Sequence, residues 1–246
     1  MRNKENWAPS KYILVKGRWR ASRDPDQVNP GSRLMVDLIA GFYNEYLKQY
    51  TGGKLLDLGC GKVPLYGAYR EFITESTCVD WQDSIHGSEF IDVWTDLNQP
   101  LPFPDHEFNT IILSDVLEHI CQPDLLWSEM ARILKPGGIL FLNVPFFYHL
   151  HEQPNDYFRF TRFALEKFAR TNGFEVVVLA PLGGLPEILT DIHAKILARI
   201  PMAGTCLAAC LQHTAIHLLR LRPLHKLSIK TAQTFPLGYF FIARKK

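Results

Sequence analysis

The segment LLDLGCG, residues 55–61, decides the fold, because an apolar run ends there in two closely spaced glycines. Residues 54–58 predict a short buried strand, and the periodic segment from Pro64 to Phe72 predicts a helix. Glycines between a strand and a helix let the backbone pass close to a ligand, and the helix points its N-terminus at the same place. The segment therefore predicts a ligand-binding turn at the edge of an α/β sheet.

Strands and helices alternate on both sides of this turn. Upstream, helical periodicity runs from Arg33 to Tyr50 and stops at Gly52 and Gly53. Downstream, we expect strands at 77–80, 90–93, 108–114, 139–144, 174–179 and 239–243, and helices at 123–134 and 161–171. Alternation of this kind implies parallel pairing. The predicted fold class is α/β: a doubly wound, Rossmann-like, mostly parallel sheet with a helical insertion before the last strand.

The chain divides into four predicted segments. Residues 1–29 lack a clear period and indicate a loosely structured N-terminal arm, whereas residues 30–184 form the core and 232–246 its final strand. Residues 185–231 form a basic insertion or lid, with helical stretches at 188–200 and 205–221. From Ile192 to Lys246 there are nine Lys and Arg but no Asp or Glu. Residues 188–230 could therefore contact a membrane or an anionic, lipid-linked acceptor, and packing on the core is the alternative.

Composition argues against several classes of protein. The five cysteines form no Cys-x-x-Cys pair, which argues against a disulfide framework and a structural zinc site. The start of the chain has charged residues and no apolar run, so no secretory signal is visible. Stacking aromatics do not alternate with the positive charges of the insertion, which argues against nucleic acid. We expect a cytoplasmic protein and leave its oligomeric state open.

Asp80 ends the second predicted strand, beside the glycine turn. A carboxylate in that position can accept hydrogen bonds from both hydroxyls of a ribose, which implies a cofactor containing a nucleoside. A nicotinamide-dependent oxidoreductase would use the same geometry, but Pro64 occupies the position of its third glycine. The structural alternative is that the glycines only form a turn and that Asp80 caps a helix.

Ordered motifs between residues 54 and 179 resemble those of class I S-adenosylmethionine methyltransferases, in the group that includes ubiquinone and menaquinone methyltransferases. The motifs are LLDLGCG, Asp80, Asp96-Leu97, LPFPD at 101–105 with Phe108, and RILKPGG at 132–138. The resemblance implies S-adenosylmethionine as the cofactor, bound by Asp57, Gly59, Cys60, Gly61, Asp80, Trp81, Asp96, Leu97 and Ser114. Val63 and Asn109 depart from the common pattern. A cofactor-binding partner subunit without activity remains an alternative to an enzyme.

Candidate acceptor residues follow the fourth and fifth strands, whose C-terminal ends face the cofactor crevice. The first group is Asp115, Glu118 and His119. Related quinone methyltransferases suggest that these residues could hold a divalent metal, but a helix start with locally satisfied side chains is the alternative, and we assign no metal. The second group lies in HEQPNDYFRFT, residues 151–161, and is similar to a segment of methyltransferases that modify bacterial surface glycans and other sugars.

Together the two groups predict the acceptor chemistry. The catalytic candidates are His149, His151, His119 and Tyr157, and the acceptor-binding candidates are Glu118, Asp156, Arg159 and Arg162. His149 or His151 is the preferred base because imidazole titrates near neutral pH, and an arginine can hold a phosphate or carboxylate through two hydrogen bonds. The predicted function is O-methylation of a small acceptor, a sugar, glycan or lipid-linked intermediate. The alternative is that these side chains only fix the loop.

Overall fold

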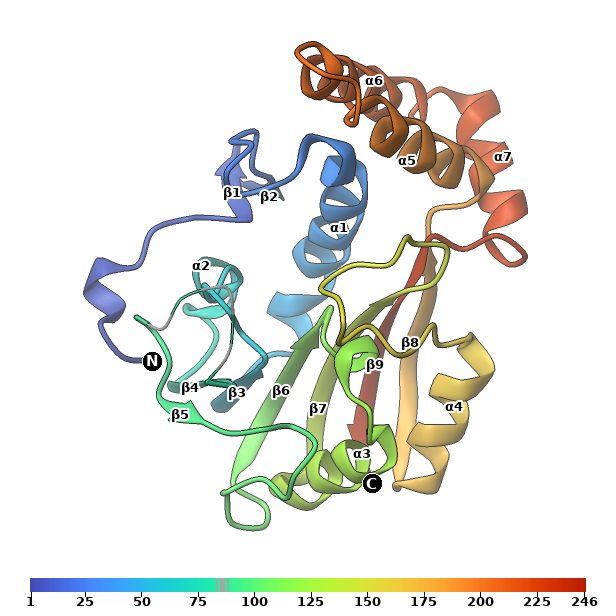
Figure 1. Ribbon diagram of the computed structural model, residues 1–246. Helices are drawn as coiled ribbons and strands as arrows, with labels where there is room; N and C mark the ends of the chain where they lie inside the picture. Colours follow the sequence, from blue (N-terminus) through green and yellow to red (C-terminus); the bar gives the residue numbers. More distant parts are fainter. Residues whose placement is uncertain (83, 85–86, 88) are drawn as a thin grey trace. The chain divides into compact units, whose positions relative to one another are not determined.

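The computed structural model describes residues 1–82, 84, 87 and 89–246 and contains a seven-stranded sheet (Figure 1). The strand order is β5-β4-β3-β6-β7-β9-β8. The strands are β3 (Lys54–Leu58), β4 (Glu75–Asp80), β5 (Val93–Trp94), β6 (Phe108–Ser114), β7 (Leu134–Pro145), β8 (Phe174–Leu182) and β9 (Gly238–Lys245). From β5 to β7 all neighbours pair in parallel, and the order reverses at β3. The predicted doubly wound sheet is confirmed, and β3 and β6 flank its switch point.

The described residues form two compact units. The first comprises residues 1–8, 46–180 and 239–246 and contains most of the sheet. Its helices are α2 (Tyr66–Tyr69), α3 (Pro123–Ile133), α4 (Arg162–Thr171) and the 3₁₀ turn η3 (Leu117–His119). The second comprises residues 9–45 and 181–238 and contains α5 (Leu185–Leu197), α6 (Gly204–Leu218), α7 (Arg222–Ala232) and most of α1 (Arg33–Tyr50).

The core of the first unit centres on Trp127 of α3, whose side chain is fully buried. Its ring stacks on Phe168 of α4 at a centroid distance of 5.8 Å and meets Phe174 and Phe241 edge-on at 5.7 and 6.0 Å. Aromatic pairs at these separations add to the stability that burial alone provides. Two helices and two strands are thereby fixed together beneath the C-terminal ends of β6 and β7.

The N-terminal arm is more ordered than predicted. Residues 12–21 form a hairpin of β1 (Tyr12–Val15) and β2 (Arg18–Ala21). Lys16 and Gly17, both with positive φ, supply the two-residue turn that suits the twist of a hairpin. Asp37 of α1 accepts a hydrogen bond from the Ala21 backbone at 2.8 Å. The pattern was missed because lysine stands where the common turn pair has Asn or Asp.

Two helical predictions also change. The helix expected from Pro64 to Phe72 is only the single turn α2, because backbone bonds between residues three apart, such as Phe72 to Tyr69, tighten both of its ends. The insertion contains a third helix, α7, which begins at Arg222-Pro223, and proline is favoured in a first helical turn. Among the described residues, no helix is both long enough and apolar enough to cross a membrane.

Candidate functional site

The glycine turn after β3 is tied to the end of β4 by Asp80. The Asp80 carboxylate accepts hydrogen bonds from the backbone nitrogens of Gly61 and Trp81, both at 2.8 Å. Gly59 has φ +65°, and a Cβ added there would lie 2.6 Å from Val116, so only glycine fits. The Ser84 hydroxyl also donates to Asp80 Oδ2, at 3.3 Å. A carboxylate has about four lone-pair sites, so Asp80 keeps about one for a ligand, and a ligand that displaces the long Ser84 contact gains a second. These residues fit the ribose of a nucleoside cofactor.

A cavity of about 340 Å³ opens beside this turn, within the first unit. Eight of the residues named from the sequence line it: Gly59, Asp80, Trp81, Asp96, Leu97, Asp115, His119 and Tyr157. Sequence reasoning missed Ser84, Asn98, Val116, Ile120, Gln153 and Asn155 as lining residues. Of these residues, only Asn98 could have been found from the sequence, because it follows Asp96 by two positions and Asp often begins a turn in that way. In the structure the Asn98 backbone nitrogen donates to the Asp96 side chain at 2.8 Å. The wall thus joins the predicted cofactor and acceptor positions in one space.

Four predicted cofactor residues do not line this cavity in the part of the chain that the structure describes: Asp57, Cys60, Gly61 and Ser114. Asp57 is buried on β3 and accepts a hydrogen bond from the Tyr69 hydroxyl at 3.1 Å. Burial raises the pKa of Asp57 to about 7, although the hydrogen bond from Tyr69 opposes the shift. In the structure Asp57 is therefore paired with Tyr69 of α2 and does not face the cavity.

The raised pKa of Asp57 predicts a pH-dependent stability. An unfolded aspartate titrates near about 3.9, so the folded state holds this proton up to about pH 7, and the associated stability is lost as pH rises between those values. Asp57→Asn avoids the buried charge, and we expect it to be more stable than the wild type at pH 8 by on the order of 2 kcal/mol. Urea unfolding of both proteins at pH 5, 6, 7 and 8 measures the difference. A difference independent of pH would contradict the assignment.

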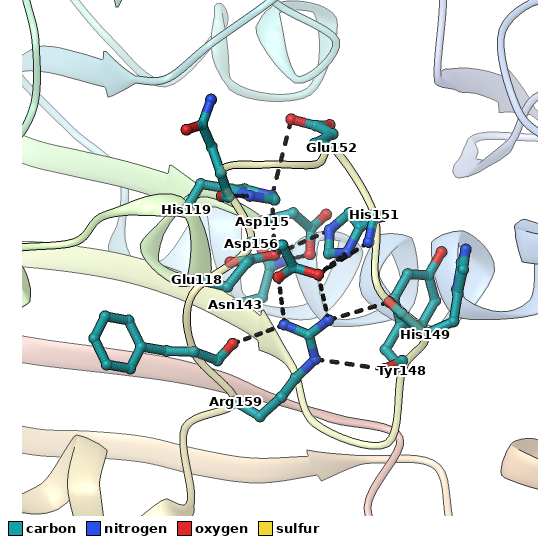
Figure 2. Close-up of polar contacts among 12 residues, drawn as sticks. Asp115, Glu118, His119, Asn143, Tyr148, His149, His151, Glu152, Asp156 and Arg159 are labelled. Carbon is teal, nitrogen blue, oxygen red and sulfur yellow. Dashed lines mark hydrogen bonds and ion pairs between the residues drawn. The ribbon is translucent and has the colours of Figure 1, made fainter.

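The acceptor end of the site is a cluster of polar side chains from η3 and from the loop between β7 and α4 (Figure 2). Glu118 is fully buried, and its Oε1 lies 3.8 Å from His119 Nε2 and 3.7 Å from His151 Nε2. His119 lines the cavity, whereas Glu118 and His151 lie behind it. We call Glu118, His119 and His151 the Glu–His–His cluster. It combines residues from both of the groups predicted as acceptor candidates.

Burial and charge shift the pKa values of Glu118 and His151. Burial raises the pKa of Glu118. Burial alone would lower the pKa of His151, but the carboxylates of Glu118, Asp156 and Glu152 outweigh it, and the pKa is raised. The Nδ1 atom of His119 lies 2.7 Å from the carbonyl oxygen of Asn155, so Nδ1 carries the proton and Nε2 presents its lone pair to the cluster.

Arg159 and Asp156, predicted to bind an acceptor, are engaged with each other. The guanidinium of Arg159 donates to both carboxylate oxygens of Asp156, at 2.6 and 2.8 Å, and to the carbonyls of His149 and Phe158. Burial works against the charge of Asp156, but the hydrogen bonds from Arg159 and the His151 backbone place its pKa well below the ordinary value. The pair clamps the loop. Neither side chain lines the cavity among the residues that the structure describes.

The remaining acceptor candidates lie in different surroundings. Arg162 pairs with Glu166 on α4 at 3.2 Å. His149 is exposed, and its ring centroid is 6.2 Å from that of His151 (Figure 2). Tyr157 faces the cavity and donates through its hydroxyl to Asn155 at 3.0 Å. Of the three predicted histidines, His119 is the one in the cavity wall.

Comparisons with known proteins indicate a methyltransferase domain. Residues 56–142 match a family model described as a methyltransferase domain. A relative from Saccharophagus degradans, the ubiquinone/menaquinone biosynthesis C-methyltransferase UbiE, is 28% identical over 131 residues, covering 44% of this chain and 53% of that protein. The chain therefore spans about half the length of the curated relatives it matches.

Solved structures share the fold. An S-adenosylmethionine-dependent methyltransferase from Archaeoglobus fulgidus has a TM-score of 0.56 and 19% identity, covering 86% of this chain and 93% of that one. The (4+2)-cyclase SpnF has a TM-score of 0.55 and 20% identity, covering 96% and 87%. The family match ends at residue 142, before the acceptor loop begins. The acceptor therefore has to be inferred from the loop itself.

Proposed function

Because this chain carries a class I S-adenosylmethionine-dependent methyltransferase domain, we propose that it transfers the methyl group to an oxygen of a small acceptor. The observation that carries this proposal is one continuous cavity, which reaches from Asp80 and Asp96 to His119 and Tyr157. The acceptor class is a sugar, a glycan or a lipid-linked intermediate, whose hydroxyl needs a group that removes its proton. His119, the member of the Glu–His–His cluster in the cavity wall, provides that group.

The mechanism follows from what each part of the cavity can do. The cofactor supplies a methyl group on a positively charged sulfur, so the protein need only align the reactants in line and exclude water. Asp80 and the glycine turn hold the nucleoside, and effective molarities on the order of 10⁵ M can result from such positioning. His119 lines the cavity, and because its Nδ1 donates to the Asn155 carbonyl, its Nε2 keeps the lone pair that would take the hydroxyl proton of an acceptor reaching it.

Methyl transfer to carbon is the second candidate, because the matched relatives are named C-methyltransferases. The two candidates differ in what the acceptor must offer. An oxygen acceptor has a titratable hydroxyl, whereas a carbon acceptor is a ring carbon made nucleophilic by a neighbouring oxyanion. The same imidazole could serve either, so the acceptor distinguishes them.

The test begins with the cofactor and then moves to the product. Calorimetric titration with S-adenosylmethionine, S-adenosylhomocysteine and NAD should show saturable binding of the first two only. Incubation with cofactor carrying a ¹³C-methyl group, against panels of sugars, nucleotide sugars and quinol precursors, then identifies the product. A methyl carbon resonance in the methoxy range supports oxygen transfer, and one in the aliphatic range supports carbon transfer. Binding of NAD instead would overturn both candidates.

We further propose that residues 188–230 contact an anionic membrane surface. Within the second unit, α5, α6 and α7 expose apolar side chains, and Arg199, Arg220, Arg222, Lys226 and Lys230 are exposed. Each such charge near an anionic surface contributes about 1 kcal/mol, and the apolar side chains can enter the headgroup region. This surface would bring the enzyme to a lipid-linked acceptor.

Replacing Arg220, Arg222 and Lys226 together by glutamate is expected to weaken binding to vesicles of phosphatidylcholine with phosphatidylserine by at least about 10-fold. Sedimentation with the vesicles measures it, and vesicles of phosphatidylcholine alone should bind neither protein. A control with the same number of reversals at Lys48, Arg170 and Lys246, which lie in the first unit, should bind like the wild type. Equal losses in both variants would show a general charge effect and reject the surface.

A further inference from the structure

Glu118 is a buried carboxylate whose hydrogen-bonding capacity is unused. Its side chain is fully buried, and neither of its oxygens has a hydrogen-bond partner among the residues that the structure describes. The Nε2 atom of His119 is also buried without a hydrogen-bond partner among the described residues. Buried polar groups in native proteins are almost always paired, because each unpaired one costs free energy. Several such atoms facing one another indicate that another group belongs between them.

The distances between the side-chain nitrogen and oxygen atoms of the cluster suit a shared metal ion better than direct hydrogen bonds. The two imidazole–carboxylate separations, 3.7 and 3.8 Å, are too long for a hydrogen bond, which needs about 2.7–3.2 Å. One ligand atom from each of the three side chains lies within 4.8 Å of the others. Zinc bonds of about 2.0–2.2 Å hold tetrahedral neighbours about 3.4 Å apart, so the two imidazole–carboxylate separations need to shorten by only tenths of an ångström, whereas the two imidazoles need to approach each other by up to about 1.4 Å.

Both histidines are held from behind, as metal ligands usually are. The Nδ1 atom of His119 faces the Asn155 carbonyl at 2.7 Å. The Nδ1 atom of His151 lies 3.3 Å from Asp156 without the geometry of a hydrogen bond, and the His151 backbone nitrogen donates to the same carboxylate at 2.9 Å. Asp156 is in turn fixed by Arg159. Contacts of this kind set the tautomer and the orientation of a ligating imidazole, and they leave Nε2 for the metal. In Figure 2 the side chains of the Glu–His–His cluster converge, whereas His149 lies to one side.

We propose that the Glu–His–His cluster binds a divalent transition-metal ion of the zinc type, which orients the acceptor hydroxyl and lowers its pKa. Two imidazoles and one carboxylate favour zinc, iron, cobalt or manganese over calcium and magnesium, which prefer oxygen ligands. Three protein ligands leave positions open for a substrate oxygen, and His119 brings the site to the cavity wall. With the ion bound, the Nε2 lone pair of His119 is a metal bond and no longer takes a proton, so the ion replaces the role as base given to His119 above by lowering the pKa of the hydroxyl, whose proton then passes to water. What the ion does rests on the proposed function, whereas its binding does not.

This site differs from the one considered from the sequence. Asp115 accepts a hydrogen bond from the Asn143 side chain at 2.6 Å, and it does not belong to the group of potential ligands. His151, from the loop after β7, takes its place. Glu152 Oε2 lies 3.9 Å from His119 Nε2, which places a further carboxylate at the edge of the site.

The test uses the full chain, stripped of metal with a chelator and titrated with Zn²⁺ and Co²⁺ alone. We expect one ion per chain by calorimetry and a Co²⁺ absorption band in the visible range. Glu118→Gln and His151→Ala should each weaken Zn²⁺ binding by at least about 10- to 100-fold. His149→Ala, a histidine of the same loop, should bind Zn²⁺ like the wild type. Absence of stoichiometric binding, or equal binding in all variants, overturns the proposal.

A second measurement needs no substitution and covers the case in which a variant does not fold. In ¹⁵N-labelled wild-type protein, added Zn²⁺ should shift the Nε2 resonances of His119 and His151 and leave those of His149 unchanged. Titration with S-adenosylhomocysteine on the metal-free protein separates the two proposals. If that cofactor product binds while Zn²⁺ does not, the metal site fails and the proposed function stands. If Zn²⁺ binds and the cofactor does not, the proposed function fails and the metal site stands.

Discussion

Replacing Asp80 by alanine is expected to lower the affinity for S-adenosylmethionine and S-adenosylhomocysteine by about 100-fold. Hydrogen bonds to a charged group contribute about 1.5–3 kcal/mol, and two ribose hydroxyls would share this carboxylate. The variant also loses the bonds that Asp80 accepts from the backbone of Gly61 and Trp81. The glycine turn would therefore lose its hydrogen bond to the end of β4, and the ligand would lose its hydrogen bonds to the carboxylate.

Calorimetric titration with S-adenosylhomocysteine measures the effect, and two further variants sharpen it. Asp80→Asn keeps one acceptor oxygen and should lie between alanine and the wild type. Glu71→Ala, an exposed carboxylate after α2, should bind within about threefold of the wild type. If Asp80→Ala bound S-adenosylhomocysteine as tightly as the wild type, the predicted contact between the ribose and Asp80 would be wrong. The orientation of the cofactor inferred from that contact would then be wrong as well.

The parts of the fold that local patterns determine were predictable. The bounds of α1, β3 and β6 are those expected from the sequence. The patterns of α1 and β3 end at glycines, and β6 is an uninterrupted apolar run that ends at the polar residues Ser114 and Asp115. The last strand was also expected, and the structure adds that β9 inserts between β7 and β8. The hairpin β1–β2 was missed, since its turn depends on positive φ at Lys16, a residue with no special preference for it.

The candidate site was predictable in part, as a set of residue types but not as a set of contacts. Strand ends place Asp80 and His119 at one edge, and both line the cavity. The sequence cannot show that Arg159 folds back onto Asp156, because that contact depends on the path of the loop. For the same reason it could not bring His151 to Glu118. Arg159 and Asp156, which the sequence predicted as acceptor-binding residues, therefore hold the loop in place through their contact with each other.

Arg159→Met is expected to lower the free energy of unfolding by about 3–5 kcal/mol, because it leaves the Asp156 carboxylate buried without its partner. The side chain of Asp156 is 2% exposed, and the arginine is its two-pronged donor. The carbonyls of His149 and Phe158 lose their donor as well. The loop between β7 and α4 should open, which would expose its amides to hydrogen exchange while the glycine turn keeps its affinity for S-adenosylhomocysteine.

Urea unfolding measures the loss of stability, and hydrogen exchange of residues 146–161 measures the opening of the loop. The double variant Arg159→Met/Asp156→Asn tests whether the unpaired Asp156 carboxylate causes them. Removing the stranded charge should recover part of the loss, because an unpaired amide costs less in a buried site than an unpaired carboxylate. Arg162→Met breaks a more exposed pair with Glu166 and should change stability by only about 1 kcal/mol or less. If Arg159→Met were no less stable than Arg162→Met, the clamp would contribute nothing to the loop, and Arg159 would again be a candidate for binding an anionic acceptor.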